Sequence, residues 1–236
     1  MKRNNSIPED YINVIYAKDV KPFTSYPSIF TKYLFERYDI KDGAKLLDFG
    51  CGRGEFLNGF IDMGVEGHGV DFTDAATKFC PNAEIKQADI ENDGLPYPDN
   101  YFDVVFSKSV IEHFHNPDIL VKEIHRCLKP GGLAIILAPS WEYNYRIYFE
   151  DYTHRTPFMM SSLNDILLIH GFNDVVVSFF KQLPILWGSF YWIFNPLSFI
   201  TRFIMPRYLS KHFKWVRFSK EIMLLSTSRK PNKWLT

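Results

Sequence analysis

Residues 46–56 read LLDFGCGRGEF, an apolar run that leads into a turn with glycine at positions 50, 52 and 54. The run is typical of a buried strand, and a helix is expected from Glu55 to Asp62. Glycine permits positive φ angles and lets a ligand approach the backbone closely. The free N–H groups at a helix start favour an anionic group. A tight turn without a ligand is the alternative, and residues further along the chain help to distinguish the two.

The glycine spacing differs from that of two common nucleotide-binding motifs. The dinucleotide fingerprint has glycine at its sixth position, where this chain has Glu55, and a Walker loop ends in Gly-Lys-Ser/Thr, which is absent here. Acidic residues instead end the next two expected strands. Asp71 suits hydrogen bonds from both hydroxyls of a ribose, and Asp89 suits an adenine amino group. We therefore expect a nucleoside ligand and no nicotinamide or flavin dinucleotide.

Short apolar runs alternate with amphipathic stretches along the rest of the chain. Helices are expected after a cap at Asn116 and from a capping box formed by Ser162 and Asp165. This alternation predicts a parallel sheet with helices on both faces. The expected strands are 45–49, 65–70, 83–88, 103–107, 133–138, 172–180 and 221–227.

The composition excludes several classes of protein. Lys and Arg together number 27, as do Asp and Glu, so no global attraction to nucleic acid is expected. The three cysteines have no metal-binding or disulfide-framework spacing, which favours a reducing compartment. The first ten residues, MKRNNSIPED, are polar and no apolar stretch of a secretory signal comes after them. A cytoplasmic location is therefore expected.

Five motifs in this order resemble those of class I S-adenosylmethionine-dependent methyltransferases, in the group that includes ubiquinone/menaquinone and sugar methyltransferases. They are DFGCGRG at 48–54, GVD at 69–71, ADI at 88–90, YFDVV at 101–105 with IEH at 111–113, and LKPGG at 128–132.

The resemblance covers roughly residues 41–180 and implies both fold and cofactor. The fold would be a Rossmann-like, mostly parallel sheet of seven strands with helices on both faces. The cofactor would be S-adenosyl-L-methionine, with S-adenosyl-L-homocysteine as the product. The residues expected to bind it are Asp48, Gly50, Cys51, Gly52, Gly54, Asp71, Phe72, Asp89, Ile90 and Ser107.

Two histidines are candidates for a catalytic base. A hydroxyl acceptor would need such a base, because its proton must leave during attack on the methyl carbon. His113 and its neighbour Glu112 come after the fourth strand, at the edge where open α/β sheets bind ligands. Alternatively, they only shape the cofactor pocket. His154 lies in a segment similar to one beside the acceptor pocket of related enzymes, or in a loop held by local hydrogen bonds.

A metal is not expected at this edge. In similar quinone methyltransferases a Glu-x-x-Glu-His segment can hold a divalent cation, but this chain has Ser109 at the first position and so lacks a hard oxygen ligand.

The residues at the end of the fourth strand narrow the acceptor class. Residues 107–109 read SKS, unlike the Pro-Pro-aromatic segment of enzymes that methylate amino groups of adenine or cytosine, and no cysteine stands there for covalent chemistry. We expect methylation of a small-molecule, sugar or lipid-linked acceptor, most simply at oxygen, and no nucleic acid. The alternative is a catalytically silent cofactor-binding scaffold or partner subunit.

An aromatic and basic insertion, 182–219, is expected between the last two strands of a domain at 41–236, with an N-terminal helical cap at 1–40. Residues 181–220 contain 11 aromatic residues, seven Lys or Arg and no Asp or Glu, whereas the rest of the chain has 20 basic and 27 acidic residues. Pro and Gly residues interrupt the uncharged run 182–201, which argues against a membrane span. A lid over the acceptor pocket, a peripheral contact of 182–220 with anionic membrane at its cytoplasmic face, or both, are expected.

Overall fold

The structure is a computed structural model that describes residues 22–232. The first part of the expected N-terminal cap, 1–21, lies outside the described residues. One sheet of seven strands runs through the molecule in the order β3-β2-β1-β4-β5-β7-β6. The strands are β1 (Lys45–Phe49), β2 (Glu66–Asp71), β3 (Glu84–Gln87), β4 (Phe102–Lys108), β5 (Leu128–Pro139), β6 (Asn173–Lys181) and β7 (Ile222–Arg229).

The first five strands are parallel to one another, and β7 runs antiparallel to both of its neighbours, β5 and β6. The carboxyl ends of β1, β2, β4 and β6 therefore point to the same edge of the sheet. The predicted mostly parallel, seven-stranded sheet is confirmed, and the strand ends lie close to those expected. The largest difference is in β5, which begins at Leu128 and so includes the LKPGG motif.

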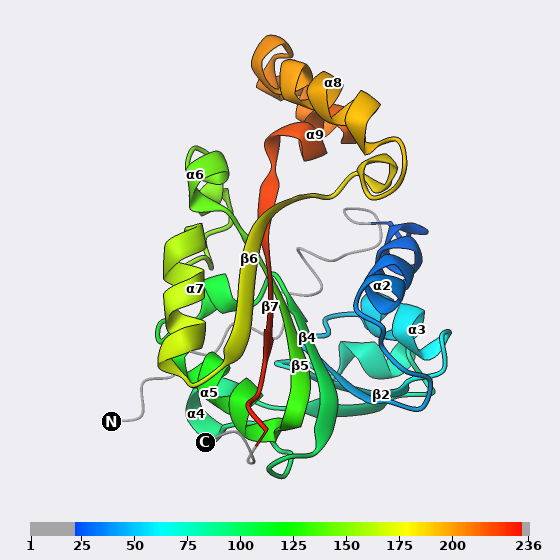
Figure 1. The fold of residues 1–236 in the computed structure, drawn as a ribbon, viewed down its shortest axis with the longest axis vertical. Coiled ribbons are helices and arrows are strands. Elements are labelled where there is room, and N and C mark those ends of the chain that lie inside the picture. The colour runs from blue at the N-terminus through cyan, green and yellow to red at the C-terminus, as the bar shows by residue number, and fades with distance from the viewer. Residues whose placement is uncertain (1–21, 233–236) are drawn as a thin grey trace.

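Helices cover both faces of this sheet (Figure 1). Side chains of α2 and α3 join one hydrophobic cluster, and side chains of α5 and α7 join the other. The helices are α2 (Tyr26–Arg37), α3 (Glu55–Ile61), α4 (Ile90–Asp93), α5 (Pro117–Cys127), α6 (Trp141–Asn144), α7 (Met160–Ile169), α8 (Tyr191–Ile204) and α9 (Lys214–Lys220).

Two helix starts test the capping residues that the sequence predicted. The side chain of Asn116 accepts a hydrogen bond of 3.2 Å from the backbone N–H of Asp118 and caps α5, as predicted. The predicted start of α7 is wrong, because the helix begins at Met160, two residues before Ser162. The Ser162 hydroxyl oxygen instead accepts from the backbone N–H of Met159 at 2.9 Å. Ser162 thus stabilises the first turn from inside the helix.

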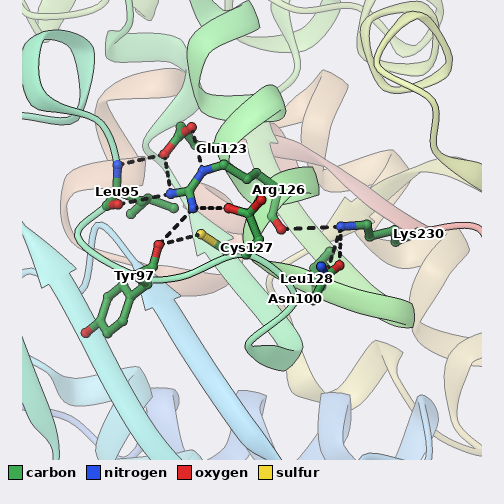
Figure 2. Close-up of polar contacts among 9 residues, drawn as sticks. Leu95, Tyr97, Asn100, Glu123, Arg126, Cys127, Leu128 and Lys230 are labelled. Atoms are coloured by element: carbon green, nitrogen blue, oxygen red, sulfur yellow. Dashed lines mark hydrogen bonds and ion pairs between the residues drawn. The ribbon is translucent and has the colours of Figure 1, made fainter.

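Arg126, near the end of α5, fastens the loop that leads into β4 (Figure 2). Its guanidinium donates hydrogen bonds of 2.7–3.0 Å to two backbone carbonyls and to two carboxylates. Because this loop precedes β4, the network lies at the amino edge of the sheet and braces the strands from the side opposite their carboxyl ends. The partners are Leu95, Tyr97, Asp99 and Glu123.

The segment between β6 and β7 forms α8, α9 and two short 3-10 turns, η4 (Pro184–Leu186) and η5 (Arg207–Lys211). Figure 1 shows these helices beyond the ends of β6 and β7. Trp187 anchors the segment, because its ring lies 4.8 Å from that of Tyr33 in α2 and 5.4 Å from that of Phe180 in β6. Within residues 22–232, no helix has both the length and the apolar character needed to cross a bilayer.

Candidate cofactor and methyl-transfer site

The glycine turn after β1 has the conformation that its sequence predicts. Gly50, Gly52 and Gly54 have φ angles of 79°, 54° and 77°, a region that other residues rarely adopt. A Cβ atom at Gly50 would lie 2.3 Å from Cγ2 of Val110. A Cβ atom at Gly52 would have no neighbouring atom within 4 Å. The turn is therefore packed against the protein at Gly50 and open at Gly52, where a ligand can approach the backbone.

Asp71, the last residue of β2, holds this turn in place. One carboxylate oxygen accepts a hydrogen bond of 2.9 Å from the backbone N–H of Gly52, and the other accepts from Thr73 at 3.2 Å. Burial raises the pKa of Asp71, and the backbone hydrogen bonds oppose that rise. The side chain thus joins the ends of β1 and β2 at the edge of one cavity.

That cavity has a volume of about 200 Å³ and lies at the carboxyl ends of β1, β2 and β4. Apolar walls and a few polar groups, as found here, are typical of sites for small molecules and cofactors. Six of the ten residues predicted to bind the cofactor line it: Gly50, Gly52, Asp71, Phe72, Asp89 and Ile90.

The other four, Asp48, Cys51, Gly54 and Ser107, do not line the cavity. Asp48 lies in the interior of the sheet with 2% of its surface exposed, and burial together with the charge of Asp71 raises its pKa to about 8. Cys51 and Ser107 are buried as well, and Gly54 caps α3. These four residues therefore pack beneath the turn and within the sheet and do not face the cavity.

His113 is the one predicted catalytic residue that lines the cavity. Its Nδ1 lies 2.9 Å from the hydroxyl oxygen of Thr153, and that hydroxyl donates to a carboxylate oxygen of Asp151 at 2.5 Å. Because the Thr153 hydroxyl donates its proton to Asp151, the Thr153 oxygen must accept a hydrogen bond from Nδ1 of His113. The hydrogen-bond network therefore assigns the proton of a neutral ring to Nδ1 and leaves Nε2 unprotonated.

The protonation state of His113 depends on its environment. Burial lowers the pKa of this imidazole to about 4, and the neighbouring His154 acts in the same direction. The ring centres of the two histidines are 4.8 Å apart. His113 is thus neutral at physiological pH, the form in which Nε2 can accept a proton.

His154 and Glu112 do not line the cavity but lie next to His113. Nδ1 of His154 lies 2.6 Å from the backbone carbonyl of Tyr148, and burial lowers the pKa of the ring. The Glu112 carboxyl is fully buried, which raises its pKa to about 8. At neutral pH this carboxyl is therefore mostly protonated.

These three side chains are the group among residues 22–232 whose geometry could suit a metal ion, with ligand atoms within 4.8 Å of one another. The Nδ1 atom of each histidine is already in a hydrogen bond, so only the two Nε2 atoms could bind a metal ion. A protonated Glu112 carboxyl would be a poor metal ligand. The absence of a metal remains a prediction.

Several cavity residues were not predicted from the sequence. Thr153 stands next to the candidate His154, but a threonine carries little signal of its own. Lys108 ends β4, and its place at the carboxyl edge of the sheet could have identified it. Its positive charge opposes the rise in the pKa of Asp48 and of Glu112.

The aromatic insertion lies apart from this cavity. None of the residues that line the cavity belongs to the insertion 182–219. The lid over the acceptor pocket stays a prediction.

Comparison with known proteins agrees with the geometry of the site. The family model described as "Methyltransferase domain" matches residues 47–136, from β1 through the turn, Asp71 and His113 into β5. These residues form a methyltransferase domain of the class I S-adenosylmethionine-dependent type. S-adenosylmethionine is accordingly the cofactor, as the motifs predicted.

Two curated relatives of this methyltransferase show the range of similarity. A demethylmenaquinone methyltransferase of Staphylococcus carnosus is 29% identical over 138 residues, 52% of this chain and 56% of that protein. Phosphoethanolamine N-methyltransferase 3 of Arabidopsis thaliana is 32% identical over 117 residues, 45% of this chain and 23% of that protein. The chain covers less than two thirds of either relative's length.

A solved structure extends the similarity in fold. Phosphoethanolamine N-methyltransferase 2 of Haemonchus contortus, in complex with S-adenosyl-L-methionine, superposes with a TM-score of 0.67 at 19% identity. The match covers 94% of this chain and 59% of that one. At this identity the likeness establishes the fold of the methyltransferase and leaves its acceptor open.

Proposed function

We propose that this methyltransferase transfers a methyl group to an oxygen atom of a small-molecule, sugar or lipid-linked acceptor, with His113 as the general base. The hydrogen-bonded series Asp151–Thr153–His113 carries the proposal. It leaves Nε2 of His113 unprotonated, and His113 lines the cavity that also holds six of the predicted cofactor residues. A scaffold that only bound the cofactor would not need an oriented base.

The proposed cofactor site uses the turn and the acidic residues that line the cavity. Asp71 would accept hydrogen bonds from the ribose hydroxyls, and Asp89 from the adenine amino group. Gly52 offers open backbone, and Phe72 and Ile90 supply apolar surface. When bound, S-adenosylmethionine supplies a methyl carbon made electrophilic by a cationic sulfur.

In the proposed reaction the acceptor oxygen attacks that carbon, a carbon–oxygen bond forms and the carbon–sulfur bond breaks. The acceptor's hydroxyl proton passes to Nε2 of His113. Thr153 and Asp151 hold the ring by Nδ1 and stabilise the imidazolium that results. Positioning of the acceptor beside a neutral base is the main contribution of the protein.

The relatives include a demethylmenaquinone methyltransferase and a phosphoethanolamine N-methyltransferase, which differ in acceptor. The experiment must therefore identify the atom that receives the methyl group. The chain would be incubated with S-adenosylmethionine labelled with ¹³C in the methyl group, together with separated water-soluble and lipid extracts. The ¹³C chemical shift of the product distinguishes a methyl ether from a methylamine or a ring methyl. A label on nitrogen or carbon would overturn the proposal of an oxygen acceptor.

The competing hypothesis is a catalytically silent cofactor-binding subunit. It predicts that S-adenosylhomocysteine binds tightly while neither extract yields a labelled product. Release of S-adenosylhomocysteine that depends on the extract, together with a labelled product, would exclude it.

We also propose that residues 182–220 make a peripheral contact with anionic membrane at its cytoplasmic face, where a lipid-linked acceptor is presented. The supporting observation is the surface of α8. Trp192 is 82% exposed, Phe203 69% and Ile204 73%. Exposed apolar side chains with basic neighbours are typical of helices that lie in a membrane interface.

A further inference from the structure

A second cavity, of about 520 Å³, lies where the insertion meets the sheet. It is bounded by the end of β6, by α2 and by α8, and it shares no lining residue with the cofactor cavity. Aromatic side chains form much of its wall: Tyr33, Tyr143, Trp187, Tyr191 and Phe199.

Three cationic side chains, Arg37, Lys181 and Arg202, line this cavity, and no Asp or Glu is among its lining residues. Arg37 donates a hydrogen bond of 2.7 Å to the hydroxyl of Tyr33 in its own helix, so Lys181 and Arg202 are the two cations left for a ligand. The Lys181 ammonium donates a hydrogen bond of 2.9 Å to the side-chain oxygen of Asn195. The Arg202 guanidinium lies 3.9 Å from the ring centre of Tyr143. Within residues 22–232, neither cation forms an ion pair with a carboxylate.

The positive charges of Lys181 and Arg202 repel each other, and burial adds to the cost of keeping both charged. Burial and the charge of Arg202 lower the pKa of Lys181. Burial also lowers the pKa of Arg202, and the charge of Arg207 adds to the effect. Two partly buried positive charges that repel one another are stabilised when an anion lies between or beside them.

We propose that this cavity binds an anionic amphiphile, with its phosphate or carboxylate head group at Lys181 and Arg202. The apolar part would lie against the aromatic wall, since Trp187 and Tyr191 line the same cavity. Phe199 lines the cavity and is also 59% exposed on α8, so the wall continues onto the apolar surface of that helix. An inorganic anion would leave this wall unused.

This site is separate from the one proposed for methyl transfer and stands without it. A lipid phosphate or a soluble amphiphile with an acidic head group would satisfy the same chemistry. The two sources differ in whether a bilayer is needed, so the test uses monomeric ligands in solution.

The experiment measures binding of dihexanoyl phosphatidate, dihexanoyl phosphatidylcholine and inorganic phosphate by isothermal titration calorimetry, each lipid below its micelle concentration. We expect phosphatidate to bind at least about tenfold more tightly than either of the others, because only it offers both the charge and the apolar part. Trp187 fluorescence gives an independent signal, since this side chain lines the cavity.

Charge-removing variants connect the binding to the two cations. Lys181→Gln and Arg202→Gln should each weaken phosphatidate binding by about tenfold or more. Arg202→Lys keeps the charge but loses the guanidinium that lies over Tyr143, so it should weaken binding less than Arg202→Gln does. Lys211→Gln is the matched control, because Lys211 is exposed in the same segment and does not line the cavity. Affinity for S-adenosylhomocysteine should be the same in all four variants and reports correct folding.

Three results would overturn the proposal. The first is phosphatidylcholine binding as tightly as phosphatidate, which would mean that charge is not recognised. The second is phosphate alone binding as tightly, which would mean an anion site without a place for a tail. The third is Lys211→Gln weakening binding as much as the two cavity variants.

Discussion

Asp71 has two tasks at the residue scale, because it accepts a hydrogen bond from Gly52 and also lines the cofactor cavity. Asp71→Ala should weaken binding of S-adenosylhomocysteine by about 1.5–3 kcal/mol through loss of a charged acceptor. Isothermal titration measures this directly. Asp74→Ala, three residues along the chain and exposed, should bind as the wild type does. Equal affinity in the wild type and Asp71→Ala would exclude the proposed role of this carboxylate.

Substitution of His113 should lower the rate of methyl transfer and leave cofactor affinity unchanged. His113→Gln is expected to lower kcat by about 10²–10⁴-fold, the range typical of a lost general base. Affinity for S-adenosylhomocysteine should remain close to that of the wild type. His212→Gln, at an exposed position on the insertion, is the control and should keep full activity. A full rate in His113→Gln would mean that positioning alone performs the reaction.

The pH dependence of the rate gives a separate test of the same histidine. Burial lowers the pKa of His113 to about 4, so the unprotonated form is lost only as the pH falls through about 4. We therefore expect kcat to show no histidine inflection between about pH 6 and 8, where an unperturbed imidazole would lose activity on acidification. An inflection near pH 6.5 that disappears in His113→Gln would contradict this assignment of the environment.

At the scale of single elements, the turn between β1 and α3 is the most constrained part of the site. Gly50→Ala would place a methyl group 2.3 Å from a side-chain carbon of Val110 at a φ angle of 79°. We expect a loss of roughly 1–3 kcal/mol in the free energy of unfolding, measured in urea. Adding Val110→Ala to Gly50→Ala should restore the part of the stability that is lost through the steric clash. The part that is lost through the strained backbone at Gly50 should remain.

Gly188→Ala is the matched control for this turn. A Cβ atom there would have no neighbour within 4 Å, and the residue does not have a positive φ angle. Its free energy of unfolding should change by less than about 0.5 kcal/mol. If Gly50→Ala were equally neutral, the turn would have more room to rearrange than the structure indicates.

The elements also show how much of this molecule the sequence could predict. The strands and α5 were predictable because their apolar residues repeat with a clear period and α5 has a capping residue at Asn116. The start of α7 was not, because the Ser162 hydroxyl can bind the backbone from inside the first turn as well as from a cap. A local motif does not distinguish these two registers.

The candidate site was predictable in its location but only partly in its residues. Motif order places the glycine turn, Asp71 and His113 at one edge of a parallel sheet. Glu112 and His113 are neighbours in the short turn η2 (Ile111–His113), yet only His113 lines the cavity. Which of two adjacent side chains faces the ligand depends on tertiary packing, and so does the contact of Thr153 with His113.

On the scale of the whole molecule, the charge and the apolar surface are unevenly distributed. The net charge of the chain is zero, yet residues 181–220 carry seven positive charges and no negative ones. The same segment exposes Trp192, Phe203 and Ile204 on α8. Folding alone does not account for this arrangement, because burying these side chains would have stabilised the molecule further.

The proposed membrane contact therefore predicts salt-sensitive binding to anionic vesicles. Each Lys or Arg near the surface contributes about 1 kcal/mol at low ionic strength, in addition to insertion of the aromatic side chains. Flotation with vesicles of phosphatidylglycerol and phosphatidylcholine, at low and high salt, measures this. We expect the chain to float with anionic vesicles at low salt and to be released largely by high salt, because screening weakens the attraction of exposed charges.

Paired variants separate apolar insertion from non-specific adsorption. Trp192→Ser with Phe203→Ser should reduce flotation strongly at low salt, because both side chains project from α8. Ile169→Ser on α7 removes an equally exposed apolar side chain, 75% exposed, from an element outside the insertion and should float as the wild type does. Lys211→Glu should weaken flotation through charge while leaving phosphatidate binding in the second cavity unchanged, since Lys211 does not line it. If the wild type stays in the soluble fraction at low salt, α8 is not a membrane contact, and the insertion is instead a lid over the acceptor or an interface between chains.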